Sequence, residues 1–278
     1  MYICNPMKFD LRYLQILFLT SFLAYGIRFL NWDISIEKIS WILFISSLTQ
    51  GLFCLAFKIP VNAMKSAIIT ALGISILMRS DYIFIYGMAG FFSIASKYIF
   101  KVNGKHFFNP ANFGISFIII STGIAWLSAE HWDTIATISF ALLGIGLVAL
   151  TNRRKIDIIG FFLLFYVGLG YLWEVWGCGK SSDNYIHDIS QGVIVFFTFF
   201  MIVDPSSTPN ARISRILWVA MLSILSIYLQ IHFHIFGAPI FALFLMSFTT
   251  PLLDAVFKNE SKFSWDSMYR RILHSNAE

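Results

Sequence analysis

Polar residues gather in one segment of an otherwise apolar chain, residues 97–114. Cationic and amide side chains stand there directly before a predicted helix: Lys97, Lys101, Lys105, His106, Asn109 and Asn112. A helix N-terminus with unpaired N–H groups and nearby cations suits an anion such as a phosphate or a carboxylate. A cytoplasmic loop would also be rich in lysine, but it does not explain two amides near the hydrocarbon boundary, where polar groups are costly. Both interpretations stay open.

A second candidate segment, residues 204–210, reads Asp-Pro-Ser-Ser-Thr-Pro-Asn and is followed by two arginines, Arg212 and Arg215. Its two prolines forbid a continuous helix, so freed backbone groups must be satisfied by protein, water or a ligand. The alternative is an interfacial turn that the aspartate caps, with the arginines reaching lipid headgroups. The polar side chains of this segment that could bind a ligand are Asp204, Thr208 and Asn210.

Other polar residues give weaker signals. Glu174 follows Trp173, and we interpret it as the outer edge of a helix with an aromatic belt. The loop at 176–188 carries acids and a histidine without ligand spacing, so it is interpreted as solvated. The three cysteines lie far apart and have no Cys or His partner at metal-ligand spacing, which indicates free thiols. The sequence shows no nucleotide-binding loop, catalytic triad or zinc motif.

Composition decides what positions these residues. The chain has 278 residues, of which 58% are hydrophobic and only 13% charged, and its mean hydropathy is +0.73. Soluble domains carry roughly 25% charged residues, and they cannot hide this much apolar surface. The apolar excess is spread along the whole chain, and no cleavable signal peptide is recognisable at its start. We therefore expect a single all-α transmembrane domain over residues 1–278, a multi-pass protein of the inner membrane.

Hydropathy predicts about ten spanning helices, since a bilayer requires about 20 apolar residues for each. The predicted helices cover residues 11–29, 40–57, 63–78, 82–100, 112–127, 134–150, 156–173, 189–203, 213–230 and 233–257. Residues 258–278 are left as a cytoplasmic tail.

Basic residues fix the predicted orientation. With ten helices, 16 of the 20 lysines and arginines fall on the side of the two termini. Cytoplasmic loops carry the excess of Lys and Arg, so both termini are predicted to be cytoplasmic. The same rule explains the net charge of +5 without nucleic acid as a partner. The four basic residues predicted on the other side are Arg28, Lys38, Arg79 and Lys180.

Two of the predicted helices are too short to span a bilayer of about 30 Å at 1.5 Å per residue. They are the third and the eighth, and each ends in Met-x-x-Asp, at Met78–Asp81 and Met201–Asp204. Because they lie five helices apart, an odd number, two such halves would be inverted across the membrane. Short, interrupted segments at matching positions indicate an inverted repeat with a site at its interface. The predicted repeats are residues 1–130 and 131–257.

The motifs resemble a known family. Gly104-Lys105-His106-x-Phe108-Asn109-Pro110-Ala111-x-x-Gly114 is similar to a motif shared by two membrane proteins, RnfD of the Rnf electron-transport complex and NqrB of the sodium-pumping NADH:quinone reductase. Met201-x-x-Asp204-Pro205-x-x-Thr208-Pro209 resembles the second motif of that family, and the Pro251-Leu252-Leu253-Asp254 ending of the last helix resembles a third.

The resemblance implies a ten-helix inverted-repeat fold, flavin binding, other complex subunits as partners and electron transfer coupled to ion movement. Relatives of this kind carry a Ser-Gly-Ala-Thr segment whose threonine is esterified to FMN, and this sequence lacks it. A non-covalent FMN or riboflavin is therefore the expected cofactor, without a metal site. The residues expected to line its site are Lys105, His106, Asn109, Pro110, Asn112 and Gly114 on one side and Asp204, Thr208 and Asn210 on the other.

Two other functions fit the same sequence. Inverted repeats with paired broken helices are a transporter architecture, so the chain could be a channel or carrier for a small polar solute. The missing attachment motif also suits a non-catalytic membrane scaffold for a biosynthetic partner.

Overall fold

The structure, a computed structural model, describes residues 10–128, 132, 134–151 and 156–257. Four of its helical runs are long and apolar enough to cross a membrane, and further apolar helices are shorter. Side chains such as Leu55, 81% exposed, and Leu252, 67% exposed, cover the outside of the helices with apolar surface. The chain is therefore a multi-pass membrane protein. The four long runs are Ile36–Phe57, Ile156–Gly177, Arg212–Phe233 and Ala238–Val256.

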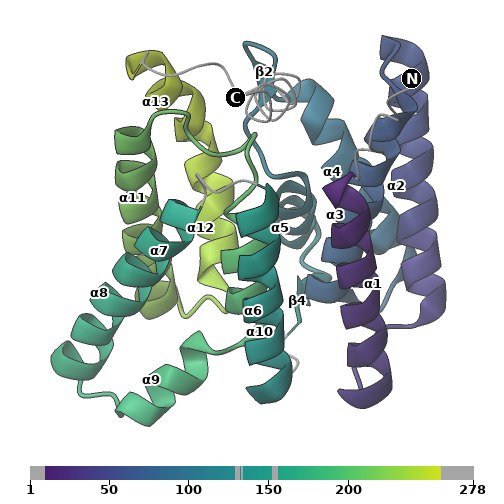
Figure 1. The fold of residues 1–278 in the computed structure, drawn as a ribbon. Helices are drawn as coiled ribbons and strands as arrows, with labels where there is room; N and C mark the ends of the chain where they lie inside the picture. Colours follow the sequence, from purple (N-terminus) through teal and green to yellow (C-terminus); the bar gives the residue numbers. More distant parts are fainter. Residues whose placement is uncertain (1–9, 129–131, 133, 152–155, 258–278) are drawn as a thin grey trace, which may run out of the picture.

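The first half, residues 10–128, is built from five α-helices and short connecting elements (Figure 1). Its helices start where capping residues satisfy free backbone N–H groups. Asp10 caps the first helix by accepting from Arg12 N, and Ser35 caps the second by accepting from Lys38 N. The elements are α1 (Leu11–Phe29), α2 (Ile36–Phe57), η1 (Val61–Ala63), α3 (Met64–Leu77), β1 (Met78–Ser80), α4 (Ile83–Ile99), β2 (Lys101–Val102), β3 (Lys105–His106), α5 (Pro110–Thr122) and β4 (Ala125–Leu127).

A two-stranded ribbon closes one end of this half. Strand β1, which continues α3, pairs antiparallel with β4, which follows α5, and Met78 lies opposite Leu127. The predicted fifth helix, 112–127, is therefore wrong at its end. Gly123 adopts a positive φ of 66° and terminates α5, because this left-handed conformation stops a helix and suits glycine. The apolar residues after it form a strand instead of another helical turn.

The second half, residues 134–257, contains a long helix that changes type along its length. Residues Ile156–Gly177 form one continuous run in which two stretches have the wider π-helical geometry. Such stretches are rare in helices and occur frequently at functional sites. The elements of this half are α6 (Thr134–Thr151), α7 (Ile156–Phe162), η3 (Leu163–Val167), α8 (Gly168–Tyr171), η4 (Leu172–Gly177), α9 (Ser182–Ile189), α10 (Gly192–Phe196), η5 (Phe197–Met201), α11 (Arg212–Phe233), α12 (Ala238–Met246), η6 (Ser247–Thr249) and α13 (Thr250–Val256).

Two predictions for this half are wrong. Residues 182–189, interpreted as solvated loop, form α9, whose Tyr185 is buried. The last predicted helix, 233–257, begins too early, because α11 continues to Phe233 and His234 then adopts a φ of 52° before α12 starts at Ala238. Hydropathy does not detect this break, since the residues around it are themselves apolar.

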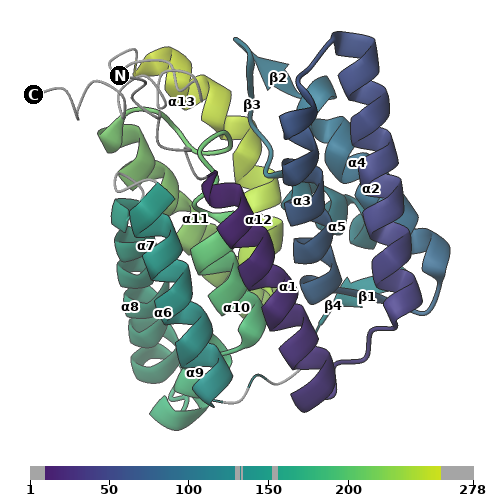
Figure 2. The same ribbon diagram turned by 45° about the vertical axis from the view of Figure 1, so that its right-hand side comes forward.

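The two halves lie side by side, with α1 crossing the front of the molecule (Figure 2). In the first half α2 packs on α3 and α4, and α4 packs on α5. In the second half α11 packs on α7 and α12, and α6 packs on α10. The halves meet where α5 contacts α12 and where α1 contacts α6. Phe22 and Phe140 join the latter pair, with ring centroids 4.4 Å apart.

Candidate functional site

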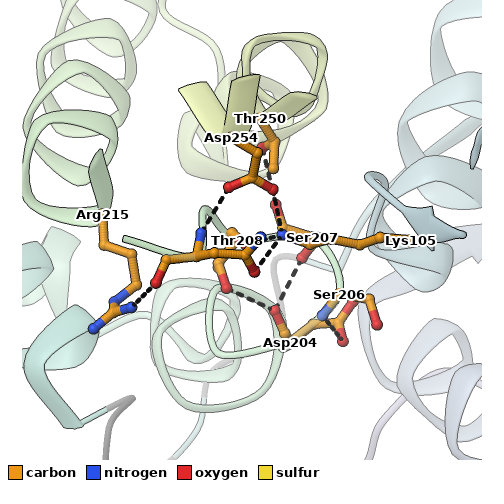
Figure 3. Close-up of polar contacts among 9 residues, drawn as sticks. Lys105, Asp204, Ser206, Ser207, Thr208, Arg215, Thr250 and Asp254 are labelled. Atoms are coloured by element: carbon orange, nitrogen blue, oxygen red, sulfur yellow. Dashed lines mark hydrogen bonds and ion pairs between the residues drawn. The ribbon is translucent and has the colours of Figure 1, made fainter. Parts of the chain in front are cut away.

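Lys105 connects the two halves at the end of the molecule that carries β2 and α13 (Figure 3). It lies in β3, which pairs with β2, and its side chain is 13% exposed. Its Nζ donates to Asp254 Oδ2 at 2.8 Å, to Thr208 O at 2.6 Å and to Asn210 Oδ1 at 3.2 Å. One cation from the first half is thus held by three oxygens of the second half. We call Lys105, Thr208, Asn210 and Asp254 the latch.

Asp254 completes the latch from α13. Its Oδ2 binds Lys105, and its Oδ1 accepts from the backbone N of Asn210 at 2.7 Å. One turn earlier, Thr250 Oγ1 donates to Ser207 O at 3.0 Å. Two side chains of α13 therefore hold the 204–210 segment in place. Sequence analysis used Asp254 as a motif position but missed its role, since 149 residues separate it from Lys105.

Asp204 organises the turn that follows η5. Its Oδ1 accepts from Ser206 N at 3.3 Å, and its backbone O accepts from Thr208 Oγ1 at 3.2 Å. The predicted turn with Asp204 as its cap is confirmed. The other carboxylate oxygen, Oδ2, is buried and has no hydrogen-bond partner among the described residues. Only one of the two carboxylate oxygens of Asp204 therefore accepts a hydrogen bond within the turn.

The two arginines after this turn behave differently. Arg212 is 71% exposed and lies 4.0 Å from Asp157, which agrees with a side chain that reaches the surface. Arg215 is only 11% exposed, and its Nη2 donates to Asp157 Oδ2 at 3.0 Å. Its Nη1 donates to Asn210 O at 2.6 Å, so it fixes the end of the 204–210 segment. The expectation that Arg215 reaches lipid headgroups is therefore wrong.

The two amides of the first motif cross to the second half as well. Asn109 caps α5, because its Oδ1 accepts from Asn112 N at 3.1 Å, and its Nδ2 donates to Met201 O at 3.1 Å. Asn112 is fully buried and donates from Nδ2 to Ile240 O in α12 at 2.8 Å. Its Oδ1 has no hydrogen-bond partner among the described residues. The amides near the hydrocarbon boundary thus hold α5 against η5 and α12.

The remaining residues of the first motif shape this region. His106 Nδ1 lies 3.0 Å from Phe108 O, and burial lowers the pKa of His106 while the charge of Asp204 opposes this effect. Burial also lowers the pKa of Lys105, although its bond to Asp254 counteracts the shift. Pro110 occupies the first turn of α5, where its missing N–H costs nothing.

Gly114 lies where α4 and α5 pack closely. A Cβ at this position would lie 1.8 Å from Ser93 Oγ and 2.6 Å from Ala89 O, both in α4. Glycine therefore allows α4 and α5 to approach closely, as small residues do between membrane helices. The expected contact of Gly114 with a cofactor stays a prediction.

The buried polar atoms that lack a hydrogen-bond partner determine which group this site could bind. The buried atoms without a partner here, Asn112 Oδ1 and Asp204 Oδ2, are both hydrogen-bond acceptors. Acceptors suit the N–H of a flavin ring. Lys105, expected to meet an anion, is already bound to Asp254. These two acceptors could receive the N–H groups of a flavin ring, whereas the Lys105 ammonium already binds Asp254 and is not free for the phosphate of FMN.

The cysteines and the acidic residues add no metal-binding group to the candidate site within the described part of the chain. Cys54 and Cys178 are free, as predicted, and Cys4 lies outside the described residues. Within the described part of the chain, no group of three or more His, Cys, Asp or Glu side chains could hold a metal ion. The tail at 258–278 and the basic residues at 153–155 also lie outside the described residues.

Comparison with known proteins gives one match. No curated protein matches the chain. A family model described as the NQR2, RnfD, RnfE family matches residues 124–262, half of the 278 residues. This range contains the 204–210 segment and Asp254, whereas the first motif around Lys105 precedes it. The expected family is confirmed, and the chain belongs to the NQR2, RnfD, RnfE family.

Proposed function

We propose that the chain is the membrane subunit of an electron-transport complex of the Rnf or sodium-pumping reductase type, with a non-covalent flavin between its halves and a role in coupling electron transfer to ion movement. One observation carries the proposal. Three motifs far apart in sequence converge on the latch, where Lys105 meets Thr208, Asn210 and Asp254. Family membership supports the assignment to such a complex.

We propose further that the ten predicted helices form two inverted repeats with both termini in the cytoplasm. The packing order supports this. Each half has a broken element at the third position, α3 followed by β1 and α10 followed by η5 and the 204–210 turn. In each half the fourth helix packs on the second and on the fifth, α4 on α2 and α5, and α11 on α7 and α12.

The flavin is assigned to the open acceptors beside the latch. Asn112 Oδ1 and Asp204 Oδ2 would accept N–H groups of the ring, and buried His106 would lie at its edge. When bound, a flavin accepts and donates one or two electrons. The chain itself orients the ring, since Asn112 is fixed by Ile240 O and Asp204 by its own turn. Residues of both halves thereby exclude water from the site.

The visible absorption spectrum of the detergent-purified protein tests the proposal. A flavin spectrum is expected, with FMN or riboflavin identified by mass spectrometry in the supernatant after acid precipitation. Flavin binding is contradicted if the protein purified from cells grown with riboflavin is colourless and gains no colour when it is reconstituted with FMN and riboflavin.

A matched pair of variants locates the site. Asn112→Leu removes an open acceptor and is expected to lower the flavin content at least about tenfold, because a buried polar group on the ligand would lose its partner. Ser116→Ala is the control, since Ser116 lies one turn further along α5 and also has a buried oxygen without a partner among the described residues. Equal flavin content in both variants would place the cofactor elsewhere.

A carrier for a small polar solute is the second candidate. The two broken elements at matching positions favour it, because transporters build their sites from such helices. Solute flux into vesicles that contain the protein but no electron donor would support the carrier and count against the redox function.

A further inference from the structure

The first half carries an excess of positive charge at the end where β2 lies. Residues 38–129 contain seven lysines and arginines but one acidic residue, Asp81. Asp81 lies between β1 and α4, at the opposite end of this half. Five of the seven basic residues lie at the end with β2: Lys58, Lys65, Lys97, Lys101 and Lys105. Any carboxylate that neutralises them must come from another part of the chain or from outside it.

Two of these five lysines receive a carboxylate from another part of the chain. Lys65 binds Asp10, which precedes α1, at 2.8 Å, and Lys105 binds Asp254 of α13 at 2.8 Å. Lys97 is 7% exposed and donates to a serine hydroxyl of α3 at 3.0 Å, so it points into the protein. The fold therefore provides a partner for three of the five ammonium groups.

Lys58 and Lys101 have no carboxylate partner among the described residues. Lys58 follows the last residue of α2, Lys101 begins β2, and both side chains are exposed. Partial burial of the Lys101 ammonium lowers its pKa, and no carboxylate opposes this effect. The dipoles of α2 and α4 favour cations at these helix ends but do not neutralise them. Both ammonium groups are therefore open to an anion from outside the chain.

Stacked aromatic rings bring these two lysines to the same place. The ring of Tyr98 in α4 stacks on Phe53 in α2, with centroids 4.3 Å apart, and on Phe57, with centroids 5.9 Å apart. Lys101 Nζ lies 4.7 Å from the centroid of the Tyr98 ring, and Lys58 directly follows Phe57. The ends of α2 and α4 thus lie side by side, each with one open lysine (Figure 2).

The surface next to the two lysines is apolar and faces outward. On α2, Leu52 is 60%, Leu55 81% and Phe57 61% exposed, and on α4, Ile99 is 67% exposed. The lysines therefore lie at the border of the hydrocarbon region, where phospholipid headgroups begin. A soluble anion would contact only the charges, whereas an anionic phospholipid places its phosphate beside the ammonium groups and its acyl chains against the apolar surface. This end is also the predicted cytoplasmic end, where anionic lipids attract basic residues.

We propose that the neighbouring ends of α2 and α4 form a binding site for an anionic phospholipid. Lys58 and Lys101 bind the headgroup phosphate, and Phe57 with the apolar surface beside it contacts an acyl chain. The site lies on the outside of the first half. It is separate from the latch and does not depend on the proposed redox function.

Native mass spectrometry of the detergent-purified protein tests the proposal, with phosphatidylglycerol and phosphatidylcholine of identical acyl chains as probes. We expect phosphatidylglycerol to bind at least about tenfold more tightly. Lys58→Gln and Lys101→Gln should each weaken its binding about fivefold, and the double variant about 25-fold. Arg28→Gln is the matched control, because Arg28 is exposed at the other end of the molecule and also lies over a ring, 5.5 Å from the centroid of Phe29. It should leave the preference unchanged.

Three results overturn the proposal. One is equal affinity of the natural chain for the two lipids, and another is a preference that persists in the double variant. The third is displacement of phosphatidylglycerol by the same concentration of glycerol 3-phosphate, because this would show that the acyl chains contribute nothing and that the lysines bind a soluble anion.

A second measurement uses the unaltered chain, in case a variant fails to fold. Acetylation of lysines by a succinimidyl ester is followed residue by residue by mass spectrometry. Phosphatidylglycerol, relative to phosphatidylcholine, should slow acetylation of Lys58 and Lys101 at least about twofold by covering their ammonium groups. Lys180, 28% exposed near α9, is the internal reference and should react at the same rate in both lipids. If all three lysines are slowed alike, the general charge of the micelle is the cause and the proposed site is wrong.

Discussion

The latch and a second cluster beside α9, formed by Glu174, Lys180, Asp188 and Gln230 and called the distal cluster, use the same chemistry at opposite ends of the molecule (Figure 1). In each a lysine binds a carboxylate, at 2.8 Å for Lys105 and Asp254 and at 2.7 Å for Lys180 and Asp188. The latch pair is 149 residues apart in sequence, whereas the distal pair is 8 apart. The latch lysine is 13% exposed and the distal lysine 28%. The first ion pair joins the two halves, and the second lines a local pocket of about 400 Å³.

Removing the latch lysine should have the largest effect on stability. Lys105→Met leaves Asp254 without its cation and frees two further acceptors, so the free energy of unfolding should fall by about 3 kcal/mol. Thermal unfolding in detergent, followed by circular dichroism, measures the change. Lys101→Met is the control, because Lys101 lies on the paired strand β2 and is exposed. A loss no larger than that of the control would show that the latch does not hold the halves together.

Close packing beside the latch should be nearly as sensitive. Gly114→Ala places a Cβ 1.8 Å from Ser93 Oγ and 2.6 Å from Ala89 O, which forces α4 and α5 apart. We expect a loss of about 2 kcal/mol and a lower flavin content, measured on the same samples. Gly160→Ala in α7 is the matched control, since nothing lies within 4 Å of its added Cβ. If both variants unfold alike, the crossing of α4 and α5 is looser than the structure describes.

The distal lysine should matter less for stability than the latch lysine. Lys180→Met is expected to lower the free energy of unfolding by about 1 kcal/mol, because water and salt reach this ion pair. Thermal unfolding in detergent, measured for Lys180→Met beside Lys105→Met, checks this difference. Equal losses of stability in both variants would remove the distinction between the two clusters.

The latch end and the distal end should lose stability at opposite extremes of pH, and these losses should be the smallest of the predicted effects. Burial lowers the pKa of His106, so its contribution is complete above the unfolded value of about 6.5 and is lost as the pH falls. The pKa of Lys180 is raised, so its contribution is complete below about 10.4 and is lost as the pH rises. Unfolding temperatures measured across this pH range should show a loss of stability at low pH that disappears in His106→Gln. They should also show a loss at high pH that disappears in Lys180→Met. If both losses of stability persist in these variants, other groups cause the pH dependence.

Local patterns in the sequence predict the helices well. The first helix, 11–29, has the observed bounds, because Asp10 caps an uninterrupted apolar run. The predicted fifth helix extends too far, since Ala125–Leu127 is as apolar as a helix and only the backbone at Gly123 redirects it. The sequence places Glu174 near the end of its helix between tryptophans, and both tryptophans are exposed, but the pattern does not predict that Glu174 itself is only 7% exposed.

The sequence predicts which residues form the candidate site, but it does not predict which of them bind each other. The motifs identify Lys105, Asn112 and Asp204, and the structure brings all three to the boundary of the halves. Asp254 as the partner of Lys105 is not predictable, because no local rule relates residues so far apart. The expected role of Lys105 as an anion ligand remains a prediction, since its ammonium is already bound to a carboxylate.

The β1–β4 ribbon bears on how the protein is made. Both strands lie within the first 127 residues, and their backbone hydrogen bonds join the ends of α3 and α5. Ser128 N extends the connection by donating to Leu77 O at 2.8 Å. The first half can therefore complete its own closure while the ribosome is still translating the second. Synthesis in this order gives the later helices a finished surface to assemble against, and it makes a split between the two halves the natural place to divide the gene into two co-expressed parts.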